Sequence, residues 1–497
     1  MNLSKSKYCN AFQCMKMLWL MNYKSEEAED VANESILENG TEVGEVAKAL
    51  FGKYIDIPFN KDLTKMINAT NEAMKNNEIC NITEASFSYE NNFCSVDILK
   101  KNHNHYEIYE VKSSTTLKEI YKEDASYQYY VLTSLGYQVD KVCLVHIDRH
   151  YSRSGPLELD KLFQVEDLTN IAKEKRKDVE KKIQEINQYI KKEEEKDIIG
   201  KQCFDPYPCP FFHYCTKHLS NPNVFDLVGV NVNQKLKYYR EGITSFESLL
   251  NSEISDKAKE QIDFEINNKK DKVEVDSLKD FLDTLTYPLY FLDFETYQQT
   301  IPLYDEIHPY EQIPFQYSLH YIEKENGEVK HKEFLAEPGI DPRETLANSL
   351  VEDIPEDVCV LAYNMGFEKS VIKKLAERFP SLSKHLLNIR ENIKDLMIPF
   401  KNRNYYTKDM KGKYSIKYVL PALFPDDPSL NYHNLEEIHN GGEAMSAFAT
   451  MHKLSTEDQE ILRKNLLKYC ELDTYAMVKI YQKIKKIKIT KINKRTT

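Results

Sequence analysis

Three features of the sequence predict a multidomain α/β protein. The chain has 497 residues, which is too many for one hydrophobic core, so two or three domains are expected. Hydrophobic residues make up 41% of the chain and charged residues 29%, values typical of a folded globular protein. In both halves, apolar runs typical of strands are separated by amphipathic segments typical of helices, and this alternation favours α/β domains.

Composition limits the compartment and the class of partner. No apolar run approaches the roughly 20 residues of a membrane span, so no membrane partner is expected. Gln13 and Lys16 interrupt the N-terminal apolar stretch, which argues against a signal peptide. Ten cysteines then indicate a reducing cytoplasm, where clustered thiols bind metal more often than they form disulfides. A net charge of −12 argues against coating of nucleic acid through overall charge, but not against a local groove.

The elements divide the chain into four parts. Residues 1–220 are predicted to contain a helical opening, a hairpin, a helix, a further strand and a long charged surface helix. Residues 221–284 are expected to form a helical connector. Alternating strands and helices return over 285–490. Residues 491–497 form a basic tail, either a solvated helix end or an arm that contacts phosphate.

The segment FLDFET, residues 291–296, places two carboxylates in an apolar strand pattern. Asp293 and Glu295 occupy alternate positions, so both side chains point to the same side, about 7 Å apart along the strand. Burial of two like charges is costly unless a cation lies between them. The pattern therefore predicts a cation site.

Two later segments supply more acidic groups. A strand over 358–362 leads through Asn364 into a helix that has Glu368 in its first turn. A later helix carries Tyr469 and Asp473 one turn apart on one face. Four carboxylates suit two Mg²⁺ or Mn²⁺ ions, which can activate a water molecule and stabilise the leaving oxygen of a phosphodiester.

The order of these motifs resembles the tyrosine-bearing DEDD exonucleases, a DnaQ/ribonuclease D-like group, over residues 285–488. The resemblance implies a ribonuclease H-like α/β domain with 3′-5′ exonuclease activity. It implies that Asp293, Glu295 and Asp473 ligate metal and that Tyr469 orients or deprotonates the attacking water.

Two further positions complete this expected site. Glu368 stands where the family has an aspartate, and it would complete the metal-binding set. Asp395 follows a later strand and is expected to support the site without acting in catalysis.

The N-terminal half carries a second set of nuclease-like residues. Asp97 lies on one strand of the predicted hairpin, and Glu110 and Lys112 share one face of the other. Two carboxylates that hold Mg²⁺, with a lysine that stabilises the developing phosphorane charge, suffice for phosphodiester hydrolysis. Gln128 on the next helix and Glu45 on an earlier one are further candidates for catalysis.

Four cysteines bracket this set: Cys14 near the N-terminus, and Cys203, Cys209 and Cys215 in CFDPYPCPFFHYC. With the Asp…Glu-x-Lys core they resemble the RecB-like PD-(D/E)XK iron–sulfur nucleases, such as the CRISPR-associated four-cysteine exonuclease. The resemblance implies a restriction-endonuclease-like α/β core whose ends are joined by a [4Fe–4S] cluster. Zn²⁺ is the alternative, because four thiolates also bind it. The other cysteines are expected in the core: Cys9, Cys80, Cys94, Cys143, Cys359 and Cys470.

In residues 409–425, lysines and tyrosines are interleaved ahead of an apolar helix. Lys413 and Lys417 are candidates for contacts with a phosphate backbone, and Tyr414 for stacking on a base. A solvated lysine-rich loop is the alternative.

The whole chain resembles a bacterial family that fuses the two nuclease types. The expected function is metal-dependent processing of nucleic-acid ends, with single-stranded DNA as the favoured substrate. Such an enzyme would serve DNA repair, antiviral defence or CRISPR spacer acquisition. An RNA 3′ exonuclease, or a nucleic-acid-binding scaffold with one inactive site, are the alternatives.

Overall fold

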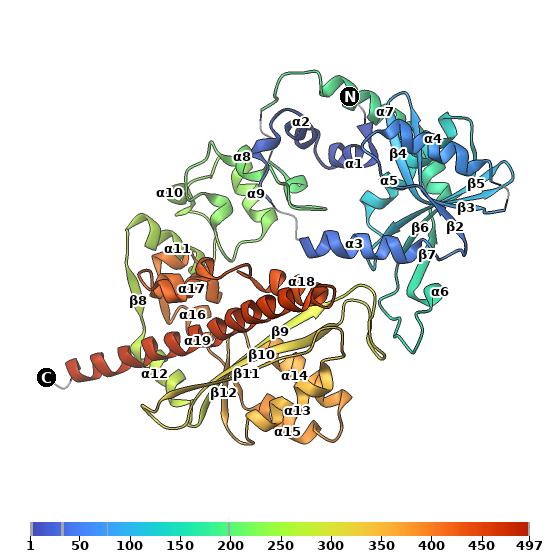
Figure 1. Ribbon diagram of the computed structural model, residues 1–497. Coiled ribbons are helices and arrows are strands. Elements are labelled where there is room, and N and C mark those ends of the chain that lie inside the picture. The colour runs from blue at the N-terminus through green and yellow to red at the C-terminus, as the bar shows by residue number, and fades with distance from the viewer. Residues whose placement is uncertain (1–2, 31–33, 77, 197–198, 496–497) are drawn as a thin grey trace. The chain divides into compact units, whose positions relative to one another are not determined.

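The computed structural model describes residues 3–30, 34–76, 78–196 and 199–495, with the side chains of 34–39 and 488–495 outside the description. The chain forms two compact units, Met1–His218 with Gln299–Glu311, and Leu219–Gln298 with Gln312–Thr497. Each unit contains a mixed sheet with helices, so the predicted multidomain α/β class is confirmed (Figure 1). A search of the described residues for a helix long and apolar enough to cross a membrane finds none.

A seven-stranded sheet organises the first unit. Its order is β2-β3-β4-β5-β6-β7, with β1 beside β4. The pairs β3/β4, β4/β5 and β6/β7 are antiparallel, whereas β2/β3, β5/β6 and β1/β4 are parallel. The strands are β1 (Leu3–Ser4), β2 (Tyr54–Asp56), β3 (Asn81–Tyr89), β4 (Asn92–Asn102), β5 (His105–Lys112), β6 (Gln138–Ile147) and β7 (Phe163–Asp167).

Helix α5 is the centre of the helical layer in this unit, where it contacts α1, α7 and the sheet. Helix α7 buries Val179, Ile183 and Ile186 along one face, the spacing of an amphipathic helix. It ends at Tyr189, whereas the charged sequence predicts a helix over residues 169–198, of which 197 and 198 lie outside the described residues. The helices are α1 (Lys5–Gln13), α2 (Met15–Tyr23), α3 (Glu34–Ala47), α4 (Leu63–Met74), α5 (Glu119–Ser134), α6 (Leu159–Leu162), α7 (Thr169–Tyr189) and α8 (Phe212–Thr216).

A five-stranded sheet in the order β11-β10-β9-β12-β13 organises the second unit. Strands β9, β10 and β11 are antiparallel, and β12 runs parallel to both β9 and β13. A separate antiparallel pair joins β8 to β14. The strands are β8 (Asp271–Val273), β9 (Leu289–Gln298), β10 (Gln312–Ile322), β11 (Val329–Leu335), β12 (Cys359–Ala362), β13 (Ile393–Asp395) and β14 (Tyr405–Thr407).

Helices cover both faces of this sheet, because its strands are apolar on both sides. Leu292 belongs to a core with α13, α14 and α15, whereas Phe291 belongs to a core with α12, α17 and α19. The helices are α9 (Val232–Arg240), α10 (Phe246–Leu249), α11 (Asp256–Ile266), α12 (Val275–Asp283), α13 (Arg343–Asp353), α14 (Gly366–Arg378), α15 (Ser383–Glu391), α16 (Ile398–Lys401), α17 (Ile416–Leu423), α18 (Gly441–Met451) and α19 (Thr456–Arg495).

The unit boundaries differ from the predicted ones in two places. The segment 221–284, expected as a separate connector, belongs to the second unit, because α12 packs on α19 and β8 pairs with β14. Residues 299–311 pack with the first unit. In the expected basic tail 491–497, the backbone of α19 continues to Arg495, and the side chains lie outside the described residues.

Candidate active site

Four carboxylates of the second unit belong to one electrostatic cluster. Asp293 and Glu295 project from β9 on the same side as Phe291, toward α19, because alternate residues of a strand share a face. The charges of Asp473 on α19 and Glu368 on α14 both raise the pKa values of these two carboxyl groups. The structure therefore brings together the four acidic residues that the sequence singles out.

The acidic groups hold their protons more tightly than exposed carboxylic acids do. Burial, together with the charge of Asp473, raises the pKa of Asp293 and of Glu295 well above their usual values. Burial raises the pKa of Asp473 to about 6, although hydrogen bonds from Tyr432 and Tyr469 oppose the rise. Like charges that share a buried site can all ionise together only when a cation joins them.

Tyr469 lies one turn before Asp473 on α19, as predicted, and is 5% exposed. Burial and the nearby charge of Asp473 raise the pKa of its hydroxyl group above the usual value. The hydroxyl therefore stays protonated near neutral pH and acts as a hydrogen-bond donor in this site.

Glu368 occupies the first turn of α14, where the sequence places it. Its side chain is buried, and among the described residues its Oε2 atom has no hydrogen-bond partner. Burial raises its pKa to about 8. An unpartnered buried carboxylate oxygen costs free energy unless a ligand completes it.

Asp395 shapes the turn that leads to Glu368. Its Oδ1 atom accepts the backbone N–H groups of Asn364 and Met397, each at 2.9 Å. Asn364 has a φ of +74°, a left-handed conformation that needs such support in a residue other than glycine. Asp395 therefore positions the turn before α14, and its supporting role in the acidic site stays a prediction.

Tyr432, which the sequence analysis missed, donates a hydrogen bond of 2.5 Å from its hydroxyl to Oδ1 of Asp473. It lies in a short 3-10 turn, Tyr432–Asn434, that carries no recognisable motif. Tyr432 and Lys417 line a cleft of about 1020 Å³. The positive charge of Lys417 lowers the pKa of both Glu295 and Asp473.

Three other positions singled out in the sequence also belong to the second unit. Cys470 belongs to the site rather than to the ordinary core: its Sγ lies within 4.8 Å of a carboxylate oxygen of Asp293 and of Glu295. Lys413 contacts Tyr418, with a 2.5 Å hydrogen bond to its hydroxyl and with its ammonium over the ring. Tyr414 is 37% exposed.

The second acidic set lies in the first unit, on β4 and β5. Lys112 pairs with Glu110 at 2.6 Å and with Asp124 on α5 at 2.7 Å. Gln128 donates to Glu110 at 2.6 Å and to Asp124 at 3.1 Å. Asp97 accepts the backbone N–H of Val111 at 2.7 Å. The structure thus brings the predicted residues together and adds Asp124.

Lys5 is the unexpected member of this set. Its ammonium lies 3.2 Å from Asp97 and 3.0 Å from Glu110, so it bridges the two carboxylates. Although burial alone would lower it, the charges of Asp97 and Glu110 raise the pKa of Lys5. The position between the two carboxylates, where the sequence analysis places a metal ion, is taken by a lysine of the chain.

A pocket of about 310 Å³ opens beside these residues and includes Glu45, as expected. The side chain of Glu45 is 63% exposed and pairs with Lys48 at 2.7 Å. Glu84 also lines the pocket. Burial and the charge of Asp97 raise its pKa to about 7.

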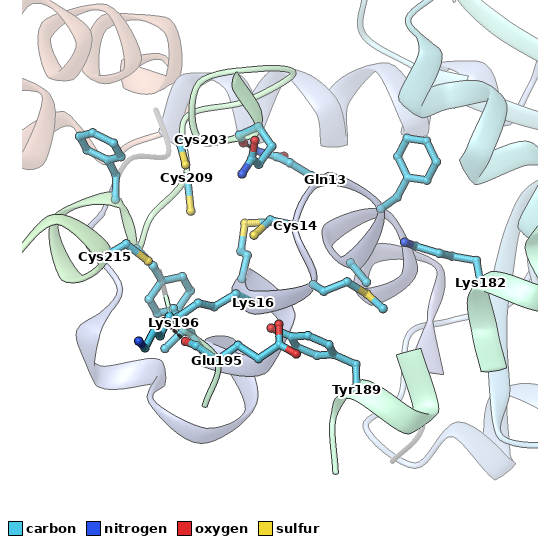
Figure 2. Close-up of a pocket in the computed structure, with 18 residues that line it drawn as sticks. Gln13, Cys14, Lys16, Lys182, Tyr189, Glu195, Lys196, Cys203, Cys209 and Cys215 are labelled. Atoms are coloured by element: carbon cyan, nitrogen blue, oxygen red, sulfur yellow. Dashed lines mark hydrogen bonds between the residues drawn. The ribbon is translucent and has the colours of Figure 1, made fainter. Parts of the chain in front are cut away.

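The four predicted cluster cysteines line one pocket of about 430 Å³ (Figure 2). Cys14 lies where α1 ends and α2 begins, and Cys203, Cys209 and Cys215 come from the segment that ends in α8. Burial raises the pKa of Cys203, and that of Cys209 to about 11. These thiols would ionise only with a cationic partner.

Hydrogen bonds hold the two ends of this unit together around the cysteines. Gln13 donates to the carbonyls of Gln202 and Tyr207, each at 2.8 Å. Lys16 donates to the carbonyl of Glu195 at 2.7 Å. Of the remaining cysteines, Cys80 is exposed, contrary to the expectation that it lies in the core. It directly precedes β3, where the chain enters the sheet from a surface turn.

Comparison with known proteins gives two matches. A family model described as a domain of unknown function (DUF2779) matches residues 290–415. This stretch includes Asp293, Glu295 and Glu368, and ends before Tyr469. The uncharacterized protein UU173 of Ureaplasma parvum serovar 3 (strain ATCC 700970) is 25% identical over 218 residues, which cover 40% of this chain and 31% of that protein. The match therefore spans about a third of that relative. No solved structure matches significantly.

Proposed function

We propose that this protein is a metal-dependent nuclease that processes nucleic-acid ends, with a 3′-5′ exonuclease site in the second unit. The observation that carries the proposal is the convergence of four carboxylates and Tyr469 at one largely buried position. Such a cluster is stable when divalent cations neutralise it. Carboxylate oxygens are the ligands that Mg²⁺ and Mn²⁺ prefer.

The residues of the site divide into ligands and positioning groups. Asp293, Glu295 and Asp473 would hold two Mg²⁺ or Mn²⁺ ions, and Oε2 of Glu368, which has no partner among the described residues, would complete the set. When bound, such ions activate a water molecule and stabilise the leaving oxygen of a phosphodiester. The protonated hydroxyl of Tyr469 is a hydrogen-bond donor, and it can orient the attacking water beside Asp473.

The strand order supports this assignment. A ribonuclease H-like sheet is expected to have three antiparallel strands followed by two parallel ones. The five-stranded sheet has this order, and β9 is its central strand. Its two carboxylates then face the helix that carries Tyr469 and Asp473, as in the DEDD exonucleases that the sequence resembles.

The first unit would contribute the RecB-like PD-(D/E)XK part of the enzyme. Asp97, Glu110, Lys112 and Gln128 form one connected set, which supports a second nuclease site. A divalent ion would have to replace the ammonium of Lys5. This feature favours a second candidate function for this unit alone, namely that it binds nucleic acid without cutting it.

The cysteine pocket supports a [4Fe–4S] cluster in the first unit. In a zinc site, Zn–S bonds of about 2.3 Å hold the sulfur atoms roughly 3.8 Å apart. The compact ligand groups found among the described residues, with ligand atoms within 4.8 Å, do not include these cysteines. A cubane cluster separates its thiolates more widely than one Zn²⁺ ion does. Iron and zinc content of protein purified without oxygen would decide between the two.

Single-stranded DNA is the substrate we favour, and RNA is the alternative. The metal chemistry is the same for both, so discrimination rests on contacts to the 2′-hydroxyl. Lys417, in the cleft beside the acidic site, is suited to a backbone phosphate, and we expect substrate binding to weaken with salt.

The proposal is tested with substrates labelled at either end. Wild type, Lys112→Ala and Asp293→Ala are compared on single-stranded DNA and RNA with Mg²⁺ or Mn²⁺. If both sites cut, each substitution removes a different set of products. Loss of all cutting in Lys112→Ala, with no change in Asp293→Ala, would overturn the assignment of the exonuclease site.

A further inference from the structure

A second group of metal-binding side chains lies in the second unit, outside the acidic site. It consists of His320 on β10, His331 on β11 and Glu471 on α19. One ring nitrogen of each histidine and one carboxylate oxygen of Glu471 lie within 4.8 Å of one another. The histidines are direct cross-strand partners, and their ring centroids are 4.4 Å apart.

Hydrogen bonds hold one nitrogen of each imidazole ring. Nδ1 of His320 lies 2.7 Å from the hydroxyl of Thr474, and Nε2 of His331 lies 2.9 Å from the hydroxyl of Ser318. These two hydroxyls are 2.6 Å apart, and the Thr474 hydroxyl also donates to the backbone carbonyl of Glu471 at 3.2 Å.

One arrangement of protons in this chain of hydrogen bonds leaves one nitrogen of each ring free for a metal. Each ring can donate its N–H to a hydroxyl, Ser318 can donate to Thr474, and Thr474 can donate to the carbonyl. The ring protons then lie on Nδ1 of His320 and Nε2 of His331, the two nitrogens that contact hydroxyls. In this arrangement, Nε2 of His320 and Nδ1 of His331 are unprotonated, the state that a metal ligand requires.

We propose that His320, His331 and Glu471 bind a divalent transition-metal ion, distinct from the ions of the acidic site. Two imidazoles and one carboxylate suit Zn²⁺ and similar ions better than Mg²⁺. His320 is 4% exposed, which fixes one ligand firmly. Glu471 is exposed, so its side chain can close the remaining distance to an ion.

The site would join two strands to the helix that carries the active-site residues. Glu471 lies between Tyr469 and Asp473 on α19, while the histidines belong to the hairpin of β10 and β11. A bound ion would therefore fix the position of α19 on the sheet. It would stabilise the folded state in proportion to the logarithm of metal concentration.

Zinc binding to the full-length protein tests this site. Wild type, His331→Gln, Glu471→Gln and the control His452→Gln, which changes an exposed histidine of the same unit, are dialysed against Zn²⁺ with excess Mg²⁺. Wild type and the control should each bind one more equivalent of Zn²⁺ than His331→Gln binds. Glu471→Gln should bind that equivalent about tenfold more weakly or worse, since it loses a charged ligand.

Thermal unfolding gives a second measurement on the same proteins. Zn²⁺ should raise the unfolding temperature of wild type and of the control more than that of His331→Gln. Asp293→Asn should keep the extra equivalent, so the result does not depend on nuclease activity. Equal zinc content in wild type, His331→Gln and Glu471→Gln would overturn the proposal.

Discussion

The two acidic clusters of this protein differ in how the repulsion between their carboxylates is balanced. In the first unit, Lys5 and Lys112 lie within 3.2 Å of carboxylates of Asp97, Glu110 or Asp124, and their two positive charges offset most of the negative charge. In the second unit, burial raises the pKa values of the acidic groups, and the charges of neighbouring carboxylates raise those of Asp293 and Glu295 further. The first cluster therefore contains cations of its own, whereas the second retains protons, which an external cation would displace under the proposed function.

Substitution of Asp293 by Asn gives the largest expected effect. Removal of nucleotides from 3′ ends should fall by about 10³-fold or more, because a metal ligand is lost. At the same time, the metal-free protein should unfold at a higher temperature, because one of the repelling buried charges is gone. End-labelled single-stranded DNA and thermal unfolding in a chelator measure the two effects. A lower unfolding temperature would contradict the account.

Substitution of Glu110 by Gln should have the opposite effect on stability. The side chain of Glu110 is 1% exposed and contacts both Lys5 and Lys112. Its neutralisation would remove one of the two carboxylate partners of each ammonium group, which costs about 1–3 kcal/mol of unfolding free energy. Urea denaturation measures this loss. An unchanged or higher stability would show that the lysines do not balance this cluster.

The pH dependence of the metal-free protein is a smaller effect with a defined sign. The pKa values of Asp473 and Glu368, about 6 and about 8 in the folded state, lie above their unfolded values near 4. The folded state therefore binds more protons between about pH 4 and pH 8, so this contribution to stability decreases as pH rises through that window.

Divalent cations should reverse this trend, because they bind the ionised carboxylates. The increase in unfolding temperature caused by Mn²⁺ should be larger at pH 8 than at pH 5.5. Thermal unfolding at both pH values, with and without Mn²⁺, measures it. If Mn²⁺ raises the unfolding temperature equally at both pH values, then Mn²⁺ does not bind to these carboxylates.

Substitution of Gly441 by Ala should have the smallest effect. A methyl group at this first residue of α18 would lie 3.5 Å from Oε2 of Glu295 and 4.0 Å from the hydroxyl of Tyr469. These are ordinary van der Waals distances, so the fold should remain stable. The added methyl group would nevertheless leave less space for a substrate beside Glu295 and Tyr469. We expect a three- to tenfold loss of exonuclease rate, roughly, with little change in unfolding temperature. If Gly441→Ala has the exonuclease rate of wild type, then the substrate does not pass beside Gly441.

The parts of the site that local pattern determines could be predicted from the sequence. The spacing of Asp293 and Glu295 fixes their common face on a strand. The sequence also places Glu368 in the first turn of a helix and Tyr469 one turn before Asp473. Each position follows from the periodicity of one element, and the structure confirms all of them.

The groups that depend on tertiary contacts could not be predicted in this way. Lys5 reaches Glu110 across 105 residues of sequence, and only the pairing of β1 with β4 brings it there. Tyr432 lies in a turn without a motif. The pairing of His320 with His331 depends on the register of β10 and β11, which the length of their connection does not reveal.

The measurement that tests the central claim most directly is the number of Mn²⁺ ions bound near neutral pH by wild type, Asp293→Asn and the control Glu356→Gln. Glu356 is an exposed residue of the same unit, so its substitution should leave the number unchanged. The account predicts that Asp293→Asn binds at least one Mn²⁺ fewer than wild type and fails to shorten 3′ ends. Equal Mn²⁺ binding by wild type and Asp293→Asn would contradict the assignment of the acidic cluster as a metal site.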